Sequence, residues 1–469
     1  MDFTPSHMLD WLKNRLPLPS RQRTRVLRHH PARATVTSGD SLGIDRHRIS
    51  DNALRTLRRL QESGYEAYIV GGGVRDLLLN LRPKDFDIAT NATPEEVRQI
   101  FRHSRIIGRR FRIVHVLWGR ETIEVTTFRG HHQNATHRSY GESSDKGLLL
   151  RDNVYGTLEE DALRRDFTVN ALYYCADGKV RDFCGGLPDL QSRLIRMIGD
   201  PEVRYREDPV RMLRAVRLAV KLDFQIEQHT AAPIARLAPL LHDISNARLF
   251  DEAVKLFMSG CARHTWEQLH AHGLFAVLFP LSARTLTADS HANALITQAL
   301  TNTDERIRQG LRVTPAFLFA ALLWPAVRTQ QQQLEQQNGN TVPARQLLHQ
   351  AAARVLGEQV KRIGIPKRFS VPMQEIWELQ WQLPQRHGSR AERLLEHPRF
   401  RAAYDFLLLR EHAGEMADGL GAWWTQYQQA DATERQALVQ ALQPDSHRSN
   451  RKRHHRRRRG PRAPAPTAD

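Results

Sequence analysis

The sequence has few cysteines and no long apolar run. Its three cysteines, Cys175, Cys184 and Cys261, are odd in number and widely spaced, which fits neither a disulfide framework nor a zinc site. The most apolar stretch, residues 315–327, is too short to cross a bilayer and contains Pro325, so we expect a buried helix there. These absences argue against a disulfide-stabilised secreted protein and against a transmembrane protein, and we expect a cytoplasmic one.

The N-terminus also lacks the apolar core of a secretory signal. Met8, Leu9, Trp11, Leu12 and Leu16 can form one face of a short amphipathic helix. We expect this helix to dock on the protein's own body; peripheral contact with the inner membrane is the alternative.

Acidic residues are outnumbered by basic ones. The chain has 69 Lys+Arg against 51 Asp+Glu, a formal net charge of +18. This excess makes a polyanion the expected partner: RNA, DNA or an anionic membrane surface. Residues 446–469 hold nine of the Lys+Arg and one Asp, too much charge to fold alone. We expect the tail to bind RNA phosphates through Arg456, Arg457, Arg458 and Arg459.

Apolar periodicity and turn residues divide the chain into an α/β part and a helical part. The expected elements are a helix over 51–62, strands over 66–70, 86–89, 111–118 and 122–128, helices from Val74 and after Thr93-Pro94, and a hairpin over 173–183. Beyond Asp208 the pattern is almost entirely helical, and residues 328–345 read as a Gln-rich, low-complexity bridge.

A glycine turn follows the strand expected over 66–70. Gly71, Gly72 and Gly73 have no β-carbons, so backbone N–H groups can approach a phosphate there, and the helix that follows adds a positive dipole end. Arg75, in the first turn of that helix, can reach the same anion. On its own this pattern also fits an ordinary turn.

Two aspartates lie a short distance further on. Asp85 and Asp87 are two residues apart, so on a strand they point to the same face. Carboxylates that close repel unless cations lie between them, and the simplest arrangement is two Mg²⁺ ions roughly 3.5–4 Å apart. The alternative is a strand-edge pair that only prevents aggregation. The adjacent glycine turn favours the metal site.

These residues resemble a known family. Residues 71–76 (GGGVRD) with 84–87 (KDFD) resemble the head signature of class II nucleotidyltransferases of the DNA polymerase beta type, which include bacterial poly(A) polymerases and CCA-adding tRNA enzymes. Residues 164–172 (RRDFTVNAL) resemble the family's ribose-contacting segment, and residues 207–211 (EDPVR) its base-recognition segment. The resemblance covers residues 50–280 most strongly.

The resemblance implies an α+β fold, with an N-terminal α/β nucleotidyltransferase head followed by mostly helical neck, body and C-terminal domains and a disordered basic tail. The expected division is a mobile basic arm (1–50), the head (51–190), the neck (191–280), the body (281–445) and the tail (446–469). Residues 106–113 (IIGRRFRI) and the Arg-rich tail favour the poly(A) polymerase branch.

That branch implies template-independent transfer of AMP from ATP to RNA 3′ ends, with two Mg²⁺ ions and release of pyrophosphate, in the service of RNA turnover. The expected partners are single-stranded RNA of little sequence specificity, ATP and proteins of RNA decay. A CCA-adding enzyme is the first alternative and a non-catalytic RNA-binding protein the second. A DNA-binding factor is a weaker one, since no recognition helix or zinc motif is evident.

The resemblance also assigns roles to residues. Asp85 and Asp87 would hold the metals. Either Glu124 or Asp166 would complete the carboxylate set. Glu124 alternates with apolar neighbours and so faces away from their side, where simple exposure to solvent is the alternative to a metal ligand. Asp166 is commonly counted with the catalytic carboxylates of the family, although a structural or ribose role is equally plausible.

The remaining roles concern the nucleotide. Arg165 would contact its sugar and phosphate, while Gly71, Gly72 and Arg75 would contact its phosphates. Asp208 and Arg211 share a helix face and would read the edge of the base as an acceptor and a fork of donors. Arg211, Arg214, Arg217 and Lys221 form a cationic stripe at helical spacing, which is either a solvated face or a steering surface.

Overall fold

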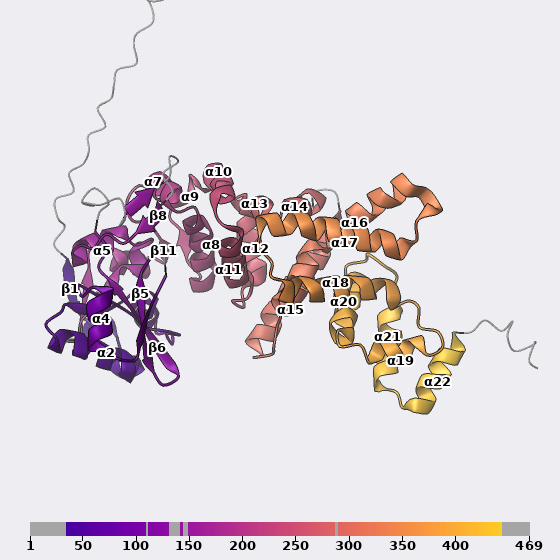
Figure 1. Ribbon diagram of the computed structural model, residues 1–469, viewed down its shortest axis with the longest axis horizontal. Coiled ribbons are helices and arrows are strands. Elements are labelled where there is room, and N and C mark those ends of the chain that lie inside the picture. The colour runs from indigo at the N-terminus through magenta and orange to yellow at the C-terminus, as the bar shows by residue number, and fades with distance from the viewer. Residues whose placement is uncertain (1–33, 109–110, 131–140, 144–148, 287–288, 443–469) are drawn as a thin grey trace, which may run out of the picture.

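An eight-stranded sheet forms the head of the molecule (Figure 1). The computed structural model describes residues 34–108, 111–130, 141–143, 149–286 and 289–442. The strand order is β1-β10-β9-β2-β3-β6-β5-β4. Strands β3 and β6 run parallel, whereas the other neighbouring pairs of this sheet are antiparallel.

The strands of the sheet are β1 (Thr35–Ser38), β2 (Ala67–Val70), β3 (Asp87–Thr90), β4 (Ser104–Ile107), β5 (Ile113–Trp118), β6 (Glu121–Thr127), β9 (Leu172–Tyr174) and β10 (Lys179–Asp182). The short strands β7 (Gly141–Ser143) and β8 (Leu149–Asp152) form one separate pair, and β11 (Leu194–Ile195) and β12 (Gln225–Ile226) form another. The helices of the head are α2 (Asp51–Glu62), α3 (Gly72–Leu78), α4 (Pro94–Ile100), α5 (Leu158–Arg164) and α6 (Gly186–Gln191). The predicted hairpin is confirmed as β9 and β10.

Helix α2 shows why the local sequence folds as it does. Ser50 caps it by accepting a hydrogen bond from the backbone N–H of Ala53 at 3.4 Å. Leu57 and Leu60 are fully buried on one side, and Gly64 reverses the chain at φ +88°. The prediction for residues 51–62 is confirmed. The Thr93 start of α4 is confirmed too, as a capping box with Glu96.

The two faces of the sheet bury different side chains. One face packs against α2, α3 and α4, and its core includes Ile88, Ile123 and Val125. The other face packs against α5 through Ala89 and Tyr173. Because side chains alternate along a strand, a residue two positions from Ala89 lies on this second face, and that residue is Asp87.

The arm predicted for residues 1–50 is wrong over residues 34–50. Strand β1 pairs with β10 at the edge of the sheet, and Ile44 and Ile49 are buried in the head core. The strand reads Thr-Val-Thr-Ser and contains a single apolar residue, so backbone pairing holds it and no hydrophobic periodicity marks it. Residues 1–33 lie outside the described residues.

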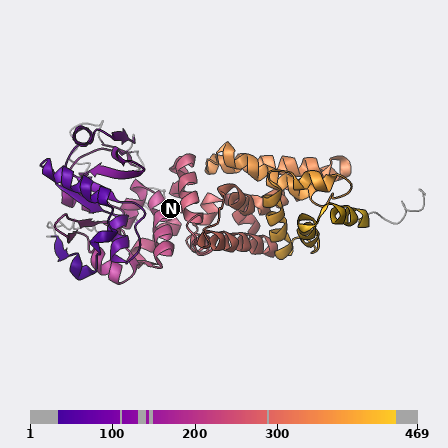
Figure 2. The same ribbon diagram turned by 90° about the horizontal axis from the view of Figure 1, so that it is seen from below.

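The rest of the described chain is helical and extends away from the head, which lies at one end of an elongated molecule (Figure 1, Figure 2). Its helices are α7 (Pro201–Glu207), α8 (Val210–Leu222), α9 (Gln228–Ala231), α10 (Ile234–Leu237), α11 (Asn246–Phe257), α12 (Ala262–Ala271), α13 (Leu274–Leu278), α14 (Pro280–Leu286), α15 (Ser290–Arg308), α16 (Pro315–Asn338), α17 (Ala344–Arg362), α18 (Lys367–Gln382), α19 (Arg390–Leu395), α20 (Phe400–His412), α21 (Leu420–Gln429) and α22 (Ala432–Ala441).

The helices predicted as a separate neck and body share one apolar core. A single cluster joins Leu213 of α8, Phe275 of α13, Phe319 of α16 and Trp377 of α18. A smaller cluster around Trp424 holds the C-terminal helices together. The neck and body therefore stabilise each other across the boundary predicted at residue 280.

The Gln-rich segment is a helix, which corrects the prediction of a low-complexity bridge. Helix α16 begins as the buried apolar helix expected over 315–327 and continues through the glutamines to Asn338. Gln331 is only 7% exposed, accepts from Arg328 at 2.9 Å and donates to Glu335 at 2.8 Å. Glutamine is a good helix former, and these bonds one turn apart support the helix. Within the described part of the chain, no helix is long and apolar enough to cross a membrane.

Candidate active site

The three glycines after β2 have different tasks. Gly71 precedes α3 with φ +80° and ψ −139°, a conformation that favours glycine. A β-carbon on Gly73 would lie 3.0 Å from the Phe86 ring and 3.2 Å from the carbonyl oxygen of Asp85. Gly73 therefore lets the segment that carries the aspartates approach α3. The helix begins at Gly72, two residues before the predicted start at Val74.

Two carboxylates face each other across the parallel strands. Asp87 of β3 is in register with Glu124 of β6, so their side chains lie on the same face of the sheet. Burial raises the pKa of Asp87 from 3.8 to about 6, with contributions from Glu124 and Asp85 and an opposing effect of Arg165. The Arg165 guanidinium does not offset burial and the two neighbouring carboxylates, so further positive charge at this place would favour the ionised form of Asp87.

Asp85 stands in the exposed segment just before β3, within electrostatic reach of Asp87. On the other side of the pair, Nε2 of His115 lies 3.3 Å from Oε1 of Glu124 without forming a hydrogen bond. No group of three His, Cys, Asp or Glu side chains in the described residues is already arranged as a set of metal ligands. The structure thus brings Asp85, Asp87 and Glu124 to one place but does not preform a closed metal cage.

Arg165 lies against the same site. The Cβ position of Gly71 is 3.7 Å from an Arg165 guanidinium nitrogen and 3.8 Å from Oδ2 of Asp87. Nε of Arg165 donates to Tyr173 at 2.9 Å and to Asp161 at 3.2 Å, and the Tyr173 hydroxyl donates to the same Asp161 carboxylate at 2.7 Å. This network holds a guanidinium beside the glycine turn, where a phosphate or sugar oxygen could accept from it.

Asp166 is engaged elsewhere. It accepts hydrogen bonds from Nε of Arg214 at 2.8 Å, from the Asn170 amide at 3.1 Å and from the Phe167 backbone at 2.8 Å. Burial alone would raise the pKa of Asp166, but Arg214 and the other donors outweigh it and hold the pKa well below its ordinary value. Asp166 therefore joins the ribose motif to α8, and its catalytic role stays a prediction.

Arg75 belongs to the same buried network. It is 4% exposed and donates to Asp76 at 2.6 Å and to Asn170 at 2.6 Å. A β-carbon on Gly72 would lie 3.4 Å from its guanidinium, so Arg75 packs beneath the glycine turn. Direct contact of Arg75 with a phosphate stays a prediction, because these bonds already orient its guanidinium.

The base-recognition segment has its own partners. Asp208 is 8% exposed, and Arg248 of α11 donates to both its oxygens, at 2.9 and 2.7 Å. Arg211 donates to Glu207 at 2.9 Å and to the carbonyl oxygen of Arg204 at 2.7 Å. Asp208 and Arg211 therefore make separate contacts with their neighbours. Their role in reading a base stays a prediction.

The cationic stripe on α8 is largely paired. Arg214 pairs with Asp166, and Arg217 lies 3.5 Å from Glu252. Most of the stripe's charge is therefore used inside the protein, which argues against a free steering surface. The predicted RNA-binding residues Arg456, Arg457, Arg458 and Arg459 lie outside the described residues.

Sequence reasoning missed several residues that support the site. Asp161 and Tyr173 orient Arg165, and His115 lies beside Glu124. Arg204 is 8% exposed and donates to the carbonyl oxygens of Arg164 and Arg165 at 2.5 and 2.7 Å. These residues reach the site because β3 pairs with β6 and because α7 contacts the ribose motif through Arg204. Neither contact is evident from the local sequence.

The sheet, the paired carboxylates and the guanidinium beside the glycine turn define a template-independent nucleotidyltransferase. Three family models match the chain: "Poly A polymerase head domain" over residues 67–196, "Probable RNA and SrmB- binding site of polymerase A" over 223–286 and "Polymerase A arginine-rich C-terminus" over 331–460. Poly(A) polymerase I of Salmonella typhimurium is 48% identical over 434 residues, which cover 91% of this chain and 93% of the relative. The chain belongs to the poly(A) polymerase I family.

CCA-adding enzymes are more distant relatives. One from Enterococcus faecalis is 37% identical over 274 residues, covering 55% of this chain and 65% of that enzyme. A solved structure of a CCA-adding enzyme in complex with CTP matches with a TM-score of 0.55 over 84% of this chain and 85% of that chain. At 17% identity this likeness shows a shared fold.

Proposed function

We propose that this chain adds AMP from ATP to the 3′ ends of RNA without a template. The RNA 3′-oxygen attacks the α-phosphorus, the bond from that phosphorus to the bridging oxygen breaks, and pyrophosphate leaves with that oxygen. The hydroxyl proton passes to solvent or to a nearby base. The observation that carries this proposal is the placement of Asp87, Glu124 and Asp85 beside the Gly71 turn and Arg165.

The carboxylates suit divalent metal. Asp85, Asp87 and Glu124 offer hard oxygen ligands. Burial and the Glu124 and Asp85 carboxylates raise the pKa of Asp87, and bound cations would relieve the repulsion among the three. We propose that they hold two Mg²⁺ ions, with Glu124 as the third carboxylate in preference to Asp166, whose oxygens are already occupied. Bound Mg²⁺ would lower the pKa of the attacking hydroxyl and neutralise the departing pyrophosphate.

The chain's own groups would position the nucleotide. The backbone at Gly71 and Gly72 and the guanidinium of Arg165 face the space where a triphosphate would lie, with Arg75 supporting the turn from below. Asp208 and Arg211 would contact the adenine edge. Catalysis then rests on positioning and charge stabilisation, with no covalent enzyme intermediate.

Single-stranded RNA of little sequence specificity is the proposed second substrate, with the Arg-rich tail as a phosphate-binding arm and RNA turnover as the process served. Proteins of RNA decay as partners, a cytoplasmic location and peripheral contact of the N-terminus with the inner membrane stay predictions.

The decisive experiment incubates the purified chain with Mg²⁺, an RNA oligomer of unrelated sequence and each nucleoside triphosphate separately. We expect a long ladder with ATP alone. A product that needs CTP and stops after a fixed addition would show a CCA-adding enzyme instead. No extension with any nucleotide, despite retained RNA binding, would favour a non-catalytic RNA-binding protein.

A further inference from the structure

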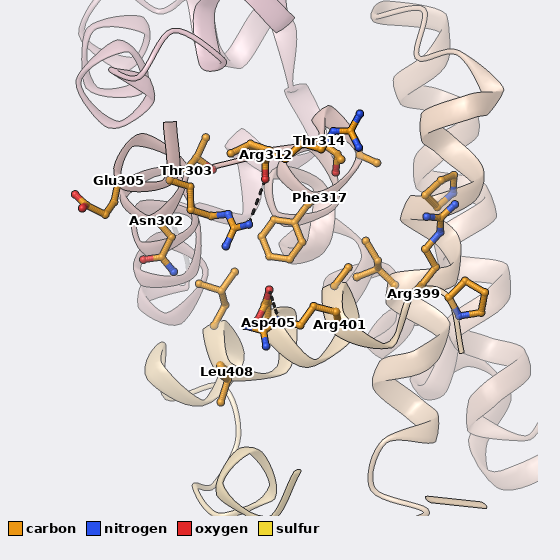
Figure 3. A pocket seen from close by; sticks show the side chains of 18 of the residues that line it. Asn302, Thr303, Glu305, Arg312, Thr314, Phe317, Arg399, Arg401, Asp405 and Leu408 are labelled. Carbon is orange, nitrogen blue, oxygen red and sulfur yellow. Dashed lines mark hydrogen bonds and ion pairs between the residues drawn. The ribbon is translucent and has the colours of Figure 1, made fainter. Parts of the chain in front are cut away.

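A cavity of about 510 Å³ lies in the helical body, remote in sequence from the head motifs. Its lining comes from α15, the loop that follows it, the helices α16, α18 and α20, and the two residues before α20 (Figure 3). This size falls within the roughly 300–1,000 Å³ of ligand-binding pockets. None of the residues proposed for ATP or metal contributes to it, so it is a separate site, independent of the proposed function.

The cavity has an apolar floor. Ile376 and Leu409 are buried beneath it, and the Phe317 ring faces into it between α15 and α20 (Figure 3). Two exposed apolar side chains adjoin lining residues in sequence: Leu311, next to Arg312, is 47% exposed, and Val371, next to Pro372, is 49% exposed. A partner that enters the cavity could also cover these two side chains.

The rim of the cavity is basic. Its acidic members are already paired on their own helices: Asp405 lies 3.1 Å from Arg401, and Glu305 pairs with Arg308. Arg399 of the lining pairs with Glu375, which lies outside it, at 2.9 Å. Among the described residues, Arg306 and Arg312 form no ion pair with a carboxylate, although the charge of Arg306 acts on Asp405 and opposes the effect of burial on its pKa. Arg306 donates to the carbonyl oxygen of Arg312 at 3.2 Å.

We propose that this cavity is a docking site for a short acidic amphipathic segment of another protein. Its apolar side chains enter the cavity and extend over Leu311 and Val371, and its carboxylates pair with Arg306 and Arg312. An apolar centre with a charged rim is the usual composition of such interfaces.

The charges and the lining favour this occupant over the alternatives. The chain's own termini outside the described residues are basic: residues 1–33 hold seven Lys+Arg and two Asp, and residues 446–469 are more basic still. RNA bases bind by stacking on open aromatic faces. The Phe317 ring is the one phenyl, phenol or indole ring in the lining, and it packs edge-on to Phe406 at 5.9 Å.

The test selects peptides from a displayed library of random 12-residue sequences on the full-length protein. Two variants probe the cavity: Ala402→Trp fills it, and the double reversal Arg306→Glu with Arg312→Glu inverts the exposed rim. Arg354→Glu, on the exposed side of α17, is the matched control for loss of a surface cation. The far-ultraviolet circular dichroism spectrum and the midpoint of thermal unfolding check that each variant is folded, and all three should match the parent.

We expect the selected peptides to combine acidic and large apolar residues. The tightest of them should lose at least about tenfold in affinity on each cavity variant, because the pocket holds the apolar anchor and the rim pairs its charges. Its affinity for Arg354→Glu should be unchanged. The proposal is overturned if no selected peptide discriminates the cavity variants, or if the peptides are basic. It is also overturned if a 15-nucleotide oligo(A) loses affinity on Ala402→Trp while the peptides do not, which would make the cavity an RNA site.

Discussion

Replacing Asp87 by asparagine should abolish activity and yet stabilise the metal-free protein. The shape of the side chain is kept, but the charge that crowds Glu124 and Asp85 is removed. Loss of one metal ligand should lower the rate by at least ~10³-fold, because a single electrostatic contact at a transition state already accounts for about 10²–10³.

The stability effect follows from the raised pKa of Asp87. The folded protein keeps a proton on this carboxyl that the unfolded chain, with an ordinary pKa of 3.8, releases. The free energy of unfolding therefore falls as pH rises from 3.8 to about 6 and stays lower above that. The difference corresponds to at most about 3 kcal/mol, and solvent screening reduces it to ~1–2 kcal/mol.

The assay is urea unfolding of the parent and of Asp87→Asn at pH 8 and at pH 4, with EDTA and then with Mg²⁺. With EDTA the variant should have the higher free energy of unfolding at pH 8, and the free energies of unfolding of the two proteins should be similar at pH 4. Added Mg²⁺ should stabilise the parent alone, because a ligand of the folded state raises its stability by mass action.

A control carboxylate should behave in the opposite way. Asp177 is exposed and hydrogen-bonded to Lys179, which lowers its pKa, so Asp177→Asn should leave stability at pH 8 unchanged or slightly lower. If Asp87→Asn is less stable than the parent at pH 8 in EDTA, the argument from crowded carboxylates fails. If Mg²⁺ stabilises both proteins equally, Asp87 is not a metal ligand.

Three further predictions follow from the neighbouring contacts. Arg204→Met removes the donor to the carbonyl oxygens of Arg164 and Arg165 and should lower kcat/KM for ATP at least about tenfold, because a lost hydrogen bond from a charged donor costs about 1.5–3 kcal/mol. An unchanged kcat/KM in a folded variant would show that this contact does not position Arg165. Arg211→Ala should weaken the preference for ATP over the other nucleotides while slow incorporation persists, and equal selectivity in competition assays would make the residue structural. Deletion after Ser446 removes nine Lys+Arg and should shorten the RNA products. If about four of these cations engage phosphates, the slope of log RNA affinity against log salt should flatten by about 3. Identical slopes and product lengths for the full and shortened proteins would exclude an RNA-binding arm.

The sequence predicted elements best where a local signal marks both ends. Helix α2 has a serine cap, a leucine stripe and a terminal glycine, and its predicted bounds are those observed. Strand β1 has no such signal, because pairing with a strand about 145 residues later holds it in place. The glutamines of α16 give no apolar periodicity and so favour an irregular segment by pattern alone, although each glutamine suits a helix.

In the candidate site, too, contacts between sequence neighbours could be predicted and contacts between distant segments could not. Asp85, Asp87 and the glycine turn are neighbours in sequence, and their proximity could be predicted from strand alternation. The preference for Glu124 over Asp166 could not, since it depends on the register of β3 with β6 and on Arg214 occupying Asp166. The partners of Asp208 and Arg211 were also out of reach, because Arg248 comes from a helix further along the chain.

The parallel pairing of β3 with β6 has a consequence for the order in which the head folds. Asp87 and Glu124 meet only after the intervening helix and strands have formed a crossover, whereas hairpins such as β9–β10 close locally. We therefore expect the carboxylate pair to form after such hairpins, and a nascent chain that ends before β6 holds Asp87 without Glu124. In the finished protein, an opening that releases β4, β5 and β6 together would separate the two carboxylates without unfolding β2 or β9. Bound metal should then slow amide hydrogen exchange in β6 more than in β9, so that exchange reports the strand pairing on which the site depends.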